Sequence, residues 1–400
     1  MRTTFLPFSP PSIGEEEIEE VIDTLRSDWI TTGPKTKRFE SEFAEFVGAP
    51  AALAVNSATS AMRVGLATLG IGAGDEVITT PMTFCSTVHV IEHSGARPVL
   101  VDVLPDTLTI DPEQVERAVT ARTKALLPVH LYGHPCAMDE LLDIAQRHHL
   151  HIVEDAAHAL PARYKGRLIG SAPLACAAGE AAEGVGVRVL TAFSFYATKN
   201  MTTGEGGMLT GAPDLIDQAR LWSLHGMSHD AYNRYNAEGS WYYEVVLPGY
   251  KCNMADIEAS LGIRQLEKLP AFQIRRHEIV ARYQVAFGAL PELEAPTERA
   301  EVESAWQLYA LRLNLDRLTI HRAQFIEELK ALNIGASVHF IPLHMQPYYA
   351  NKYGYQFADY PVAQREYMRL VSLPLYPRMS DQDVTDVIEA VQAVVEKYRR

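Results

Sequence analysis

One lysine of this 400-residue chain stands where it could act as a nucleophile. Lys199 lies in the segment Thr191-Ala-Phe-Ser-Phe-Tyr-Ala-Thr-Lys-Asn200, directly after an apolar run that is typical of a buried strand, and the glycine-rich segment Thr203-Gly-Glu-Gly-Gly207 follows it. Burial removes water from an ammonium group, lowers its pKa and frees the amine to attack an aldehyde. The alternative is an ordinary loop lysine whose aliphatic stem packs on the sheet.

Two carboxylates follow another apolar run, in the segment His151-Ile-Val-Glu-Asp155. Ligands of open α/β sheets bind at the carboxyl ends of the strands. Because successive side chains of a strand point to opposite faces, we expect only one of Glu154 and Asp155 to enter such a site. An aspartate there would keep a pyridine nitrogen protonated and its ring electron-withdrawing. The alternative role for Asp155 is to cap the helix that follows.

A third segment, Val55-Asn-Ser57-Ala-Thr59-Ser60, ends an apolar strand and opens an apolar helix. Backbone amides at a helix N-terminus, together with the Thr59 hydroxyl, would bind an anion such as phosphate. The segment is no Walker A motif, since the chain has no G-x-x-x-x-G-K-[ST]. The alternative is a plain Ser/Thr helix cap.

These three groups together match one cofactor. Pyridoxal 5′-phosphate (PLP) requires a lysine that forms a Schiff base, an acidic partner for its ring nitrogen and a cradle for its phosphate. Phe84 is a candidate to stack on the ring, and His158 is a candidate to lie against it. The alternative for Phe84 is a core aromatic residue, and for His158 a structural histidine.

The elements that must position these groups follow from the hydrophobic pattern. Seven short runs, rich in Val, Ile and Leu on both faces, alternate with helical patterns such as 58–69 and 139–149. This alternation is typical of a large α/β domain with a mostly parallel seven-stranded sheet. The predicted strands are 51–55, 76–79, 98–102, 125–130, 151–155, 189–195 and 207–210.

Helices are predicted before this sheet. Ser12 and Glu15 have the spacing of a capping box, and the apolar residues that follow recur with the period of a helix. Those residues are Ile18, Val21, Ile22 and Leu25. A second amphipathic segment carries Phe39, Phe43, Phe46 and Val47 on one face.

The pattern of predicted helices and strands changes after about residue 270. A charged helix at 272–287, a strand at 306–313, a helix at 321–332, a strand at 337–340 and a helix at 381–398 predict a smaller α+β domain. We therefore expect the N-terminal helices and a large PLP-binding α/β domain over residues 1–270, and the small domain over residues 271–400.

Composition excludes several classes of function. Thirty-six Lys and Arg against 50 Asp and Glu give a formal net charge of −14, which argues against binding to nucleic acid or to an anionic membrane. The four cysteines form no C-x-x-C pair, and no H-E-x-x-H motif occurs, so we expect no disulfide scaffold and no metal site. Without an apolar leader or a spanning segment, the sequence predicts a cytoplasmic protein.

Over nearly its whole length, the chain resembles the DegT/DnrJ/StrS-type sugar aminotransferases, which are PLP-dependent enzymes of fold type I. It is most similar to UDP-4-keto-pentose and 4-keto-hexose aminotransferases, such as those of the aminoarabinose, perosamine and pseudaminic-acid pathways. The ordered set of motifs carries the resemblance. These motifs are Trp29-Ile-Thr-Thr-Gly-Pro34, Asn56-Ser-Ala-Thr59, Gly74-Asp-Glu-Val-Ile78, Pro128-Val-His-Leu-Tyr-Gly133, Glu154-Asp-Ala-Ala-His158, Phe193-Ser-Phe-Tyr-Ala-Thr-Lys-Asn200, Gly204-Glu-Gly-Gly207, Gly249-Tyr-Lys-Cys-Asn253 and Val338-His-Phe-Ile-Pro-Leu-His344.

The resemblance implies a role for each site residue. Lys199 binds the cofactor and moves the proton, Asp155 pairs with the pyridine nitrogen, and Phe84 and His158 flank the ring. The resemblance further implies a homodimer with two shared active sites. The cofactor phosphate is then held by Ser57, Ala58, Thr59 and Ser194, and by Asn253 from the neighbouring subunit. The implied contacts of the sugar nucleotide are Trp29, Thr31, Arg234 and His344.

The implied reaction is a ping-pong transfer of an amino group from L-glutamate to the keto group of a nucleotide-linked sugar, such as a 4-keto sugar. The product would serve the biosynthesis of surface polysaccharide, lipopolysaccharide or antibiotic sugars. Three alternatives remain. A PLP-dependent sugar dehydratase has a histidine in place of the lysine, and a nicotinamide-dependent epimerase or reductase needs G-x-G-x-x-G, where this chain has Asn-Ser-Ala-Thr. A non-catalytic PLP-fold sensor is not excluded by the residues alone.

The chain departs from the family pattern at two places. An Ala/Gly-rich segment at 172–186 is longer than the connector expected before the lysine strand, so it either alters substrate access or bulges into solvent. Cys252 stands beside Asn253 where many relatives have an aromatic residue, which predicts looser packing there.

Overall fold

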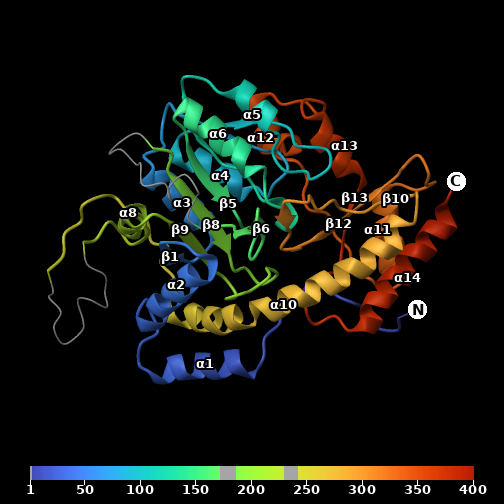
Figure 1. Ribbon diagram of the computed structural model, residues 1–400, viewed down its shortest axis with the longest axis horizontal. Helices are drawn as coiled ribbons and strands as arrows, with labels where there is room; N and C mark the ends of the chain where they lie inside the picture. The colour runs from blue at the N-terminus through green and yellow to red at the C-terminus, as the bar shows by residue number, and fades with distance from the viewer. Residues whose placement is uncertain (1, 172–185, 229–241) are drawn as a thin grey trace.

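A computed structural model of the protein describes residues 2–171, 186–228 and 242–400 (Figure 1). The large domain is built on one seven-stranded sheet with strand order β1-β9-β8-β5-β4-β2-β3. All neighbouring strands are parallel except β9, which is antiparallel to both β1 and β8. The predicted mostly parallel seven-stranded sheet is therefore confirmed. The strands are β1 (Ala51–Val55), β2 (Glu76–Thr79), β3 (Arg97–Leu100), β4 (Thr123–Leu126), β5 (His151–Asp155), β8 (Val189–Ser194) and β9 (Gly207–Gly211).

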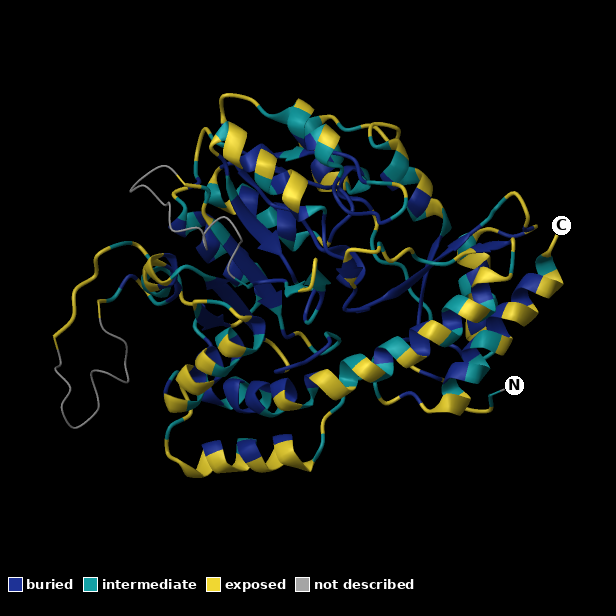
Figure 2. Ribbon diagram, in the orientation of Figure 1, coloured by how far each residue is buried: buried dark blue, intermediate teal, exposed yellow. Residues whose placement is uncertain are grey.

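Helices cover both faces of this sheet and bury it, as the dark-blue strands of Figure 2 show. Alternate side chains of each strand point to opposite faces, so each face of the sheet has its own apolar clusters. One face packs against α3 (Ala58–Thr68), α4 (Ser86–Ser94) and α8 (Pro213–Ser223). The other face packs against α2 (Pro34–Val47), α5 (Pro112–Ala118), α6 (Met138–His148) and the first half of α10 (Asp256–Gly288).

The small domain has its own antiparallel sheet of order β10-β12-β13. Its strands are β10 (Leu293–Glu294), β12 (Tyr309–Leu313) and β13 (Leu370–Leu373), and its helices are α11 (Arg322–Ala331), α12 (Pro347–Tyr353), α13 (Pro361–Arg369) and α14 (Asp381–Tyr398). A third small sheet joins β11 (Val302–Glu303) to β6 (Arg163–Tyr164) and β7 (Arg167–Leu168). The N-terminal segment also packs in the small domain, where Leu6 pairs with Ile334.

The helix predicted at 272–287 is the second half of a longer one. Helix α10 runs without interruption from Asp256 to Gly288 and contains Pro270 in its interior. It crosses the domain boundary predicted at residue 270, because its first half buries Ile263 in the large domain and its second half buries Ile279 in the small one. The strand predicted at 337–340 is wrong, since in this segment only Ser337 pairs, through a single bridge to β13.

The capping prediction for the first helix is also wrong. Helix α1 (Glu15–Arg26) begins after Gly14, whose backbone N–H donates to the Glu17 carboxylate at 2.8 Å. The predicted capping box had paired Ser12 with Glu15. The true cap lies two residues later, and the Glu17 carboxylate that accepts from Gly14 also forms an ion pair with Lys268 of α10.

The face that α1 turns to the protein is the polar one. Glu17 and Glu20 are buried against α10, whereas Ile18, Ile22 and Leu25 are exposed. The helical period of the apolar residues was predicted correctly, and these residues lie on the side of α1 that faces away from its own chain. Gln265 and Lys268 bind Glu17, and Lys35 and Arg264 bind Glu20, so the carboxylates are held inward by partners distant in sequence.

Across the described residues, no helix is both long and apolar enough to span a membrane. The same residues hold no group of three or more His, Cys, Asp or Glu side chains arranged to bind a metal ion.

Candidate active site

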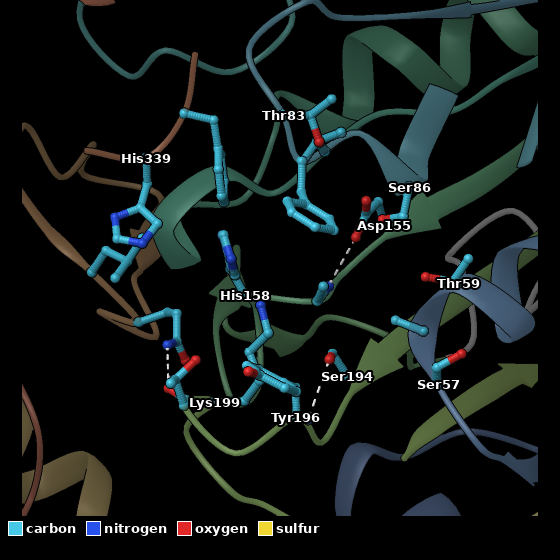
Figure 3. A pocket seen from close by; sticks show the side chains of 18 of the residues that line it. Ser57, Thr59, Thr83, Ser86, Asp155, His158, Ser194, Tyr196, Lys199 and His339 are labelled. Atoms are coloured by element: carbon cyan, nitrogen blue, oxygen red, sulfur yellow. Dashed lines mark hydrogen bonds between the residues drawn. The ribbon is translucent and has the colours of Figure 1, made fainter. Parts of the chain in front are cut away.

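A cavity of about 490 Å³ opens at the carboxyl ends of β5 and β8. It is walled by the large domain on one side and on the other by Gln307, Leu308, His339 and Phe340 of the small domain. Figure 3 shows Ser57 and Thr59 at one end of the cavity and His339 at the other, with Asp155, His158 and Lys199 between them. The structure thus brings the three predicted chemical groups together in one place.

Lys199 enters this cavity from the turn that follows β8. Its backbone N–H donates to the Tyr196 carbonyl at 2.9 Å, which closes the turn and fixes the start of the side chain. Burial lowers the pKa of the Lys199 ammonium to about 8, against the opposing effect of the Asp155 charge. The free amine, which nucleophilic attack on an aldehyde requires, is therefore far more populated near neutral pH than in an ordinary lysine.

Asp155 is the last residue of β5 and is 4% exposed. Its Oδ2 accepts a hydrogen bond from the Thr87 hydroxyl at 2.7 Å, and its Oδ1 accepts from the Ala157 backbone N–H at 3.1 Å. Glu154 does not line the cavity and instead accepts from the buried His130 ring at 2.9 Å. The two carboxylates therefore take separate directions, and Asp155 is the one that faces the cavity.

The N-terminus of α3 forms the end of the cavity that lies away from His339. Ser57 caps the helix by accepting from the Ser60 backbone N–H at 3.1 Å, and Ser57, Ala58 and Thr59 line the cavity together with Ser194. Because the positive end of the helix dipole and several hydroxyls converge there, this end suits a phosphate group.

Glycine is required beside this helix start. A Cβ atom on Gly207 of β9 would lie 2.4 Å from the Ser57 carbonyl carbon and 2.6 Å from the Ala58 nitrogen. Only a residue without a side chain lets β9 pack against the backbone that faces the phosphate end. The described groups thus fit PLP: donors for its phosphate, Lys199 for its aldehyde and Asp155 for its ring nitrogen.

Aromatic side chains stand where the ring of the cofactor would lie. Phe84 lines the cavity although it is 57% exposed, and its ring centroid is 5.8 Å from that of Phe340. His158 stacks on Phe340 at 5.9 Å and accepts a hydrogen bond from the Tyr132 backbone N–H at its Nδ1. Burial lowers the pKa of His158 well below its usual value, and the positive charge of Lys199 adds to this, so its ring is neutral with the proton on Nε2.

Three predicted residues lie together outside this cavity. The Asn253 side chain donates to the Thr32 hydroxyl at 2.5 Å, and the Trp29 indole donates to the Thr32 carbonyl at 3.1 Å. Thr31 is exposed in the same segment. The roles of Trp29, Thr31 and Asn253 therefore stay predictions for a site that a second copy would complete.

The remaining predicted residues fall elsewhere. His344 is 1% exposed, lies outside the cavity lining, donates from Nε2 to the Phe357 carbonyl at 3.2 Å and packs against Tyr360, so its substrate contact stays a prediction. Arg234 and nearly all of the Ala/Gly-rich segment lie outside the described residues. Cys252 is buried, and its thiol faces the Ser223 carbonyl at 3.6 Å.

The structure adds residues to the site that the sequence did not suggest. Thr83 lines the cavity and is linked to Asp155 through the buried Thr87 hydroxyl, and Gln307 and His339 line the cavity from the small domain. The two threonines stand on either side of Phe84, four residues apart, and this helical spacing is only a weak signal in the sequence. Gln307 carried no signal, because only the docking of the two domains places it at the cavity.

Comparison with known proteins agrees with this geometry. Residues 11–392 match the DegT/DnrJ/EryC1/StrS aminotransferase family. The chain is 53% identical over 396 residues to the spore coat polysaccharide biosynthesis protein SpsC of Bacillus subtilis, which covers 98% of both chains.

Two solved structures extend the comparison. The putative sugar aminotransferase Spr1654 of Streptococcus pneumoniae, in its PMP form, is 38% identical with a TM-score of 0.88, over 98% of this chain and 99% of that one. The same protein has been solved in a PLP form. Helicobacter pylori PseC, an aminotransferase of pseudaminic acid biosynthesis, is 26% identical with a TM-score of 0.87, over 99% and 100% of the two chains. This chain therefore belongs to the DegT/DnrJ/EryC1/StrS aminotransferase family and is a PLP-dependent transaminase of the sugar aminotransferase class.

Proposed function

We propose that the protein transfers the amino group of L-glutamate to the keto carbon of a nucleotide-linked 4-keto sugar that serves polysaccharide biosynthesis. The observation that carries the proposal is the position of the Lys199 amine, which enters a cavity that Asp155 and the start of α3 also line. Burial lowers the pKa of this amine to about 8. The likeness to the polysaccharide protein SpsC supports the sugar class of the substrate.

Asp155, Lys199 and the start of α3 each have a part in this transfer. When bound, PLP supplies an aldehyde that condenses with amines and a ring that withdraws electrons from the neighbouring carbon. Asp155, whose carboxylate is held in place by two accepted hydrogen bonds, would pair with the ring nitrogen. Lys199, with a pKa near the working pH, can both accept and release the proton of the reacting carbon. The amides and hydroxyls at the start of α3 fix the position of the phosphate.

The second part of the proposal is a homodimer in which each subunit completes the site of the other. Asn253, Trp29 and Thr31 lie together and do not line the cavity of their own chain. The apolar face of α1, formed by Ile18, Ile22 and Leu25, is exposed in the single chain. A second copy would cover this exposed surface, and each chain would bring its Asn253 to the phosphate end of the other chain's cavity. This arrangement would explain why Asn253, Trp29 and Thr31 do not line the cavity of their own chain.

A two-step spectroscopic experiment tests the reaction. The visible absorption of the PLP-loaded protein is expected to bleach on addition of L-glutamate, and to return on addition of the right member of a panel of UDP-, GDP- and dTDP-linked 4-keto sugars. L-Glutamine serves as the comparison donor. A spectrum that no amino donor changes would identify a non-catalytic sensor, and release of water from the sugar without gain of nitrogen would identify a dehydratase.

A further inference from the structure

Gln307 reaches the cavity from the small domain, two residues before β12. The residue is 3% exposed, and its Nε2 donates a hydrogen bond of 2.7 Å to the Thr198 carbonyl. Thr198 directly precedes Lys199, so this bond ties the side-chain amide to the turn that presents the catalytic amine. The nitrogen of Gln307 is therefore committed to the protein.

The oxygen of the same amide is not committed. Among the described residues, Oε1 of Gln307 is buried and has no hydrogen-bond partner. Exchanging the oxygen and nitrogen positions would not help, because two acceptor oxygens would then face each other at Thr198. Since buried polar atoms almost always have partners, an orphaned acceptor on a residue that lines a ligand cavity points to a donor on the ligand.

The surroundings restrict what that ligand group can be. His339 stacks on Phe8 at 5.2 Å and its Nδ1 bonds the Ser372 hydroxyl at 2.9 Å. Burial, with the nearby Lys199 charge, lowers the pKa of His339 to about 4, so its imidazole is neutral at neutral pH. Apart from Lys199, this small-domain end of the cavity carries no fixed cation among the lining residues that the structure describes. An acceptor oxygen in such surroundings repels a carboxylate and suits a hydroxyl.

We propose that Gln307 is a specificity-determining residue whose Oε1 accepts a hydrogen bond from a hydroxyl group of the sugar. The inference rests on the proposed function and adds to it the contact that selects the sugar. A site with a buried acceptor discriminates strongly against a substrate that lacks the matching hydroxyl, because the acceptor is then left unpaired.

The test separates the two half-reactions. Gln307→Met keeps the length of the side chain and removes both polar atoms. We expect the rate constant kcat/KM of the sugar half-reaction to fall about 10- to 100-fold, while bleaching by L-glutamate changes by less than about threefold.

The matched control addresses the bond to Thr198. Ser9→Ala removes a second and longer bond to the same carbonyl, at 3.4 Å, from a residue that does not line the cavity. We expect Ser9→Ala to leave both half-reactions within about threefold of the wild type. Equal losses in both half-reactions of Gln307→Met would mean that Gln307 only holds the lysine turn, and would overturn the proposal.

A binding measurement supplies a readout that needs no turnover. In a Lys199→Ala background, the dissociation constant of the sugar nucleotide, measured by titration calorimetry, is expected to rise about 10- to 100-fold on Gln307→Met. An unchanged constant would overturn the inference and leave the proposed function standing. A wild-type enzyme that converts no sugar of the panel would overturn the proposed function and this inference with it.

Discussion

The hydroxyl of Thr87, on α4, donates a hydrogen bond of 2.7 Å to Oδ2 of Asp155 at the end of β5. Because that hydroxyl has one proton, the Thr83 hydroxyl 2.7 Å away must donate to the Thr87 oxygen. Two buried hydroxyls thus form a chain of hydrogen bonds that ends on one carboxylate and fixes its position. Asp155, which we propose pairs with the ring nitrogen of the cofactor, is thus held by residues of α4 and of the segment just before it.

Removing this support should weaken cofactor binding. Thr87→Val keeps the shape of the side chain and deletes the donor, and we expect it to lower PLP affinity about 5- to 30-fold, since one hydrogen bond to a charged group is lost. Equilibrium dialysis against PLP measures the change. Thr87→Ser, which keeps the hydroxyl, is the control, and equal affinities of the Val and Ser variants would contradict the role of the hydroxyl.

Replacing the catalytic amine should stop the transfer without unfolding the chain. Lys199→Ala is expected to lower the rate of amino transfer by at least about 10²- to 10⁴-fold, because no other described group in the cavity combines a nucleophilic amine with a suitable pKa. Single-turnover bleaching with L-glutamate measures the rate. Circular dichroism and the melting temperature serve as the folding control, and a variant that still turns over would refute the assignment of Lys199.

The reaction of cofactor-free protein with PLP should depend on pH through Lys199. Its pKa of about 8 lies below the ordinary lysine value, so the nucleophilic free amine is gained as pH rises through 8. We expect the rate of Schiff-base formation, followed by visible absorbance, to increase up to about pH 8 and then to level off. A rate that keeps rising toward pH 10 would show that the amine is not desolvated.

The glycine beside the start of α3 should tolerate no side chain. Gly207→Ala would place a methyl group within 2.4 Å of the Ser57 backbone, and we expect a loss of about 1–3 kcal/mol in the free energy of unfolding together with weaker PLP binding. Urea denaturation measures the first effect. Gly288→Ala, at the end of α10 with open space around it, is the control and should cost nothing.

Shared active sites can be tested by mixing two defective chains. In a dimer of one Lys199→Ala and one Asn253→Ala chain, one site combines both intact residues and the other has neither. Random reassociation of equal amounts makes half of the dimers mixed, so activity should return to roughly a quarter of the wild-type value. Activity equal to the mean of the two separate variants would show that Asn253 serves its own chain.

Much of this architecture follows from local sequence pattern. The strand that ends in Asp155 and the one that leads to Lys199 are continuous apolar runs between turn residues. Such runs are typical of strands that are buried on both faces of a parallel sheet. Because parallel strands share one carboxyl edge, the meeting of Asp155, Lys199 and the start of α3 was predictable as well. The ordered set of motifs was sufficient to predict the family.

Other features depended on partners far away in the chain. The buried face of α1 is set by carboxylates that Lys268 and Gln265 hold inward, against the apolar period of the helix itself. Gln307 becomes a cavity residue only when the small domain docks against the lysine turn. Local periodicity determines which elements form, since it depends on neighbouring residues alone. Which side chain enters the site is decided by contacts between distant elements, whose free energies no local pattern contains.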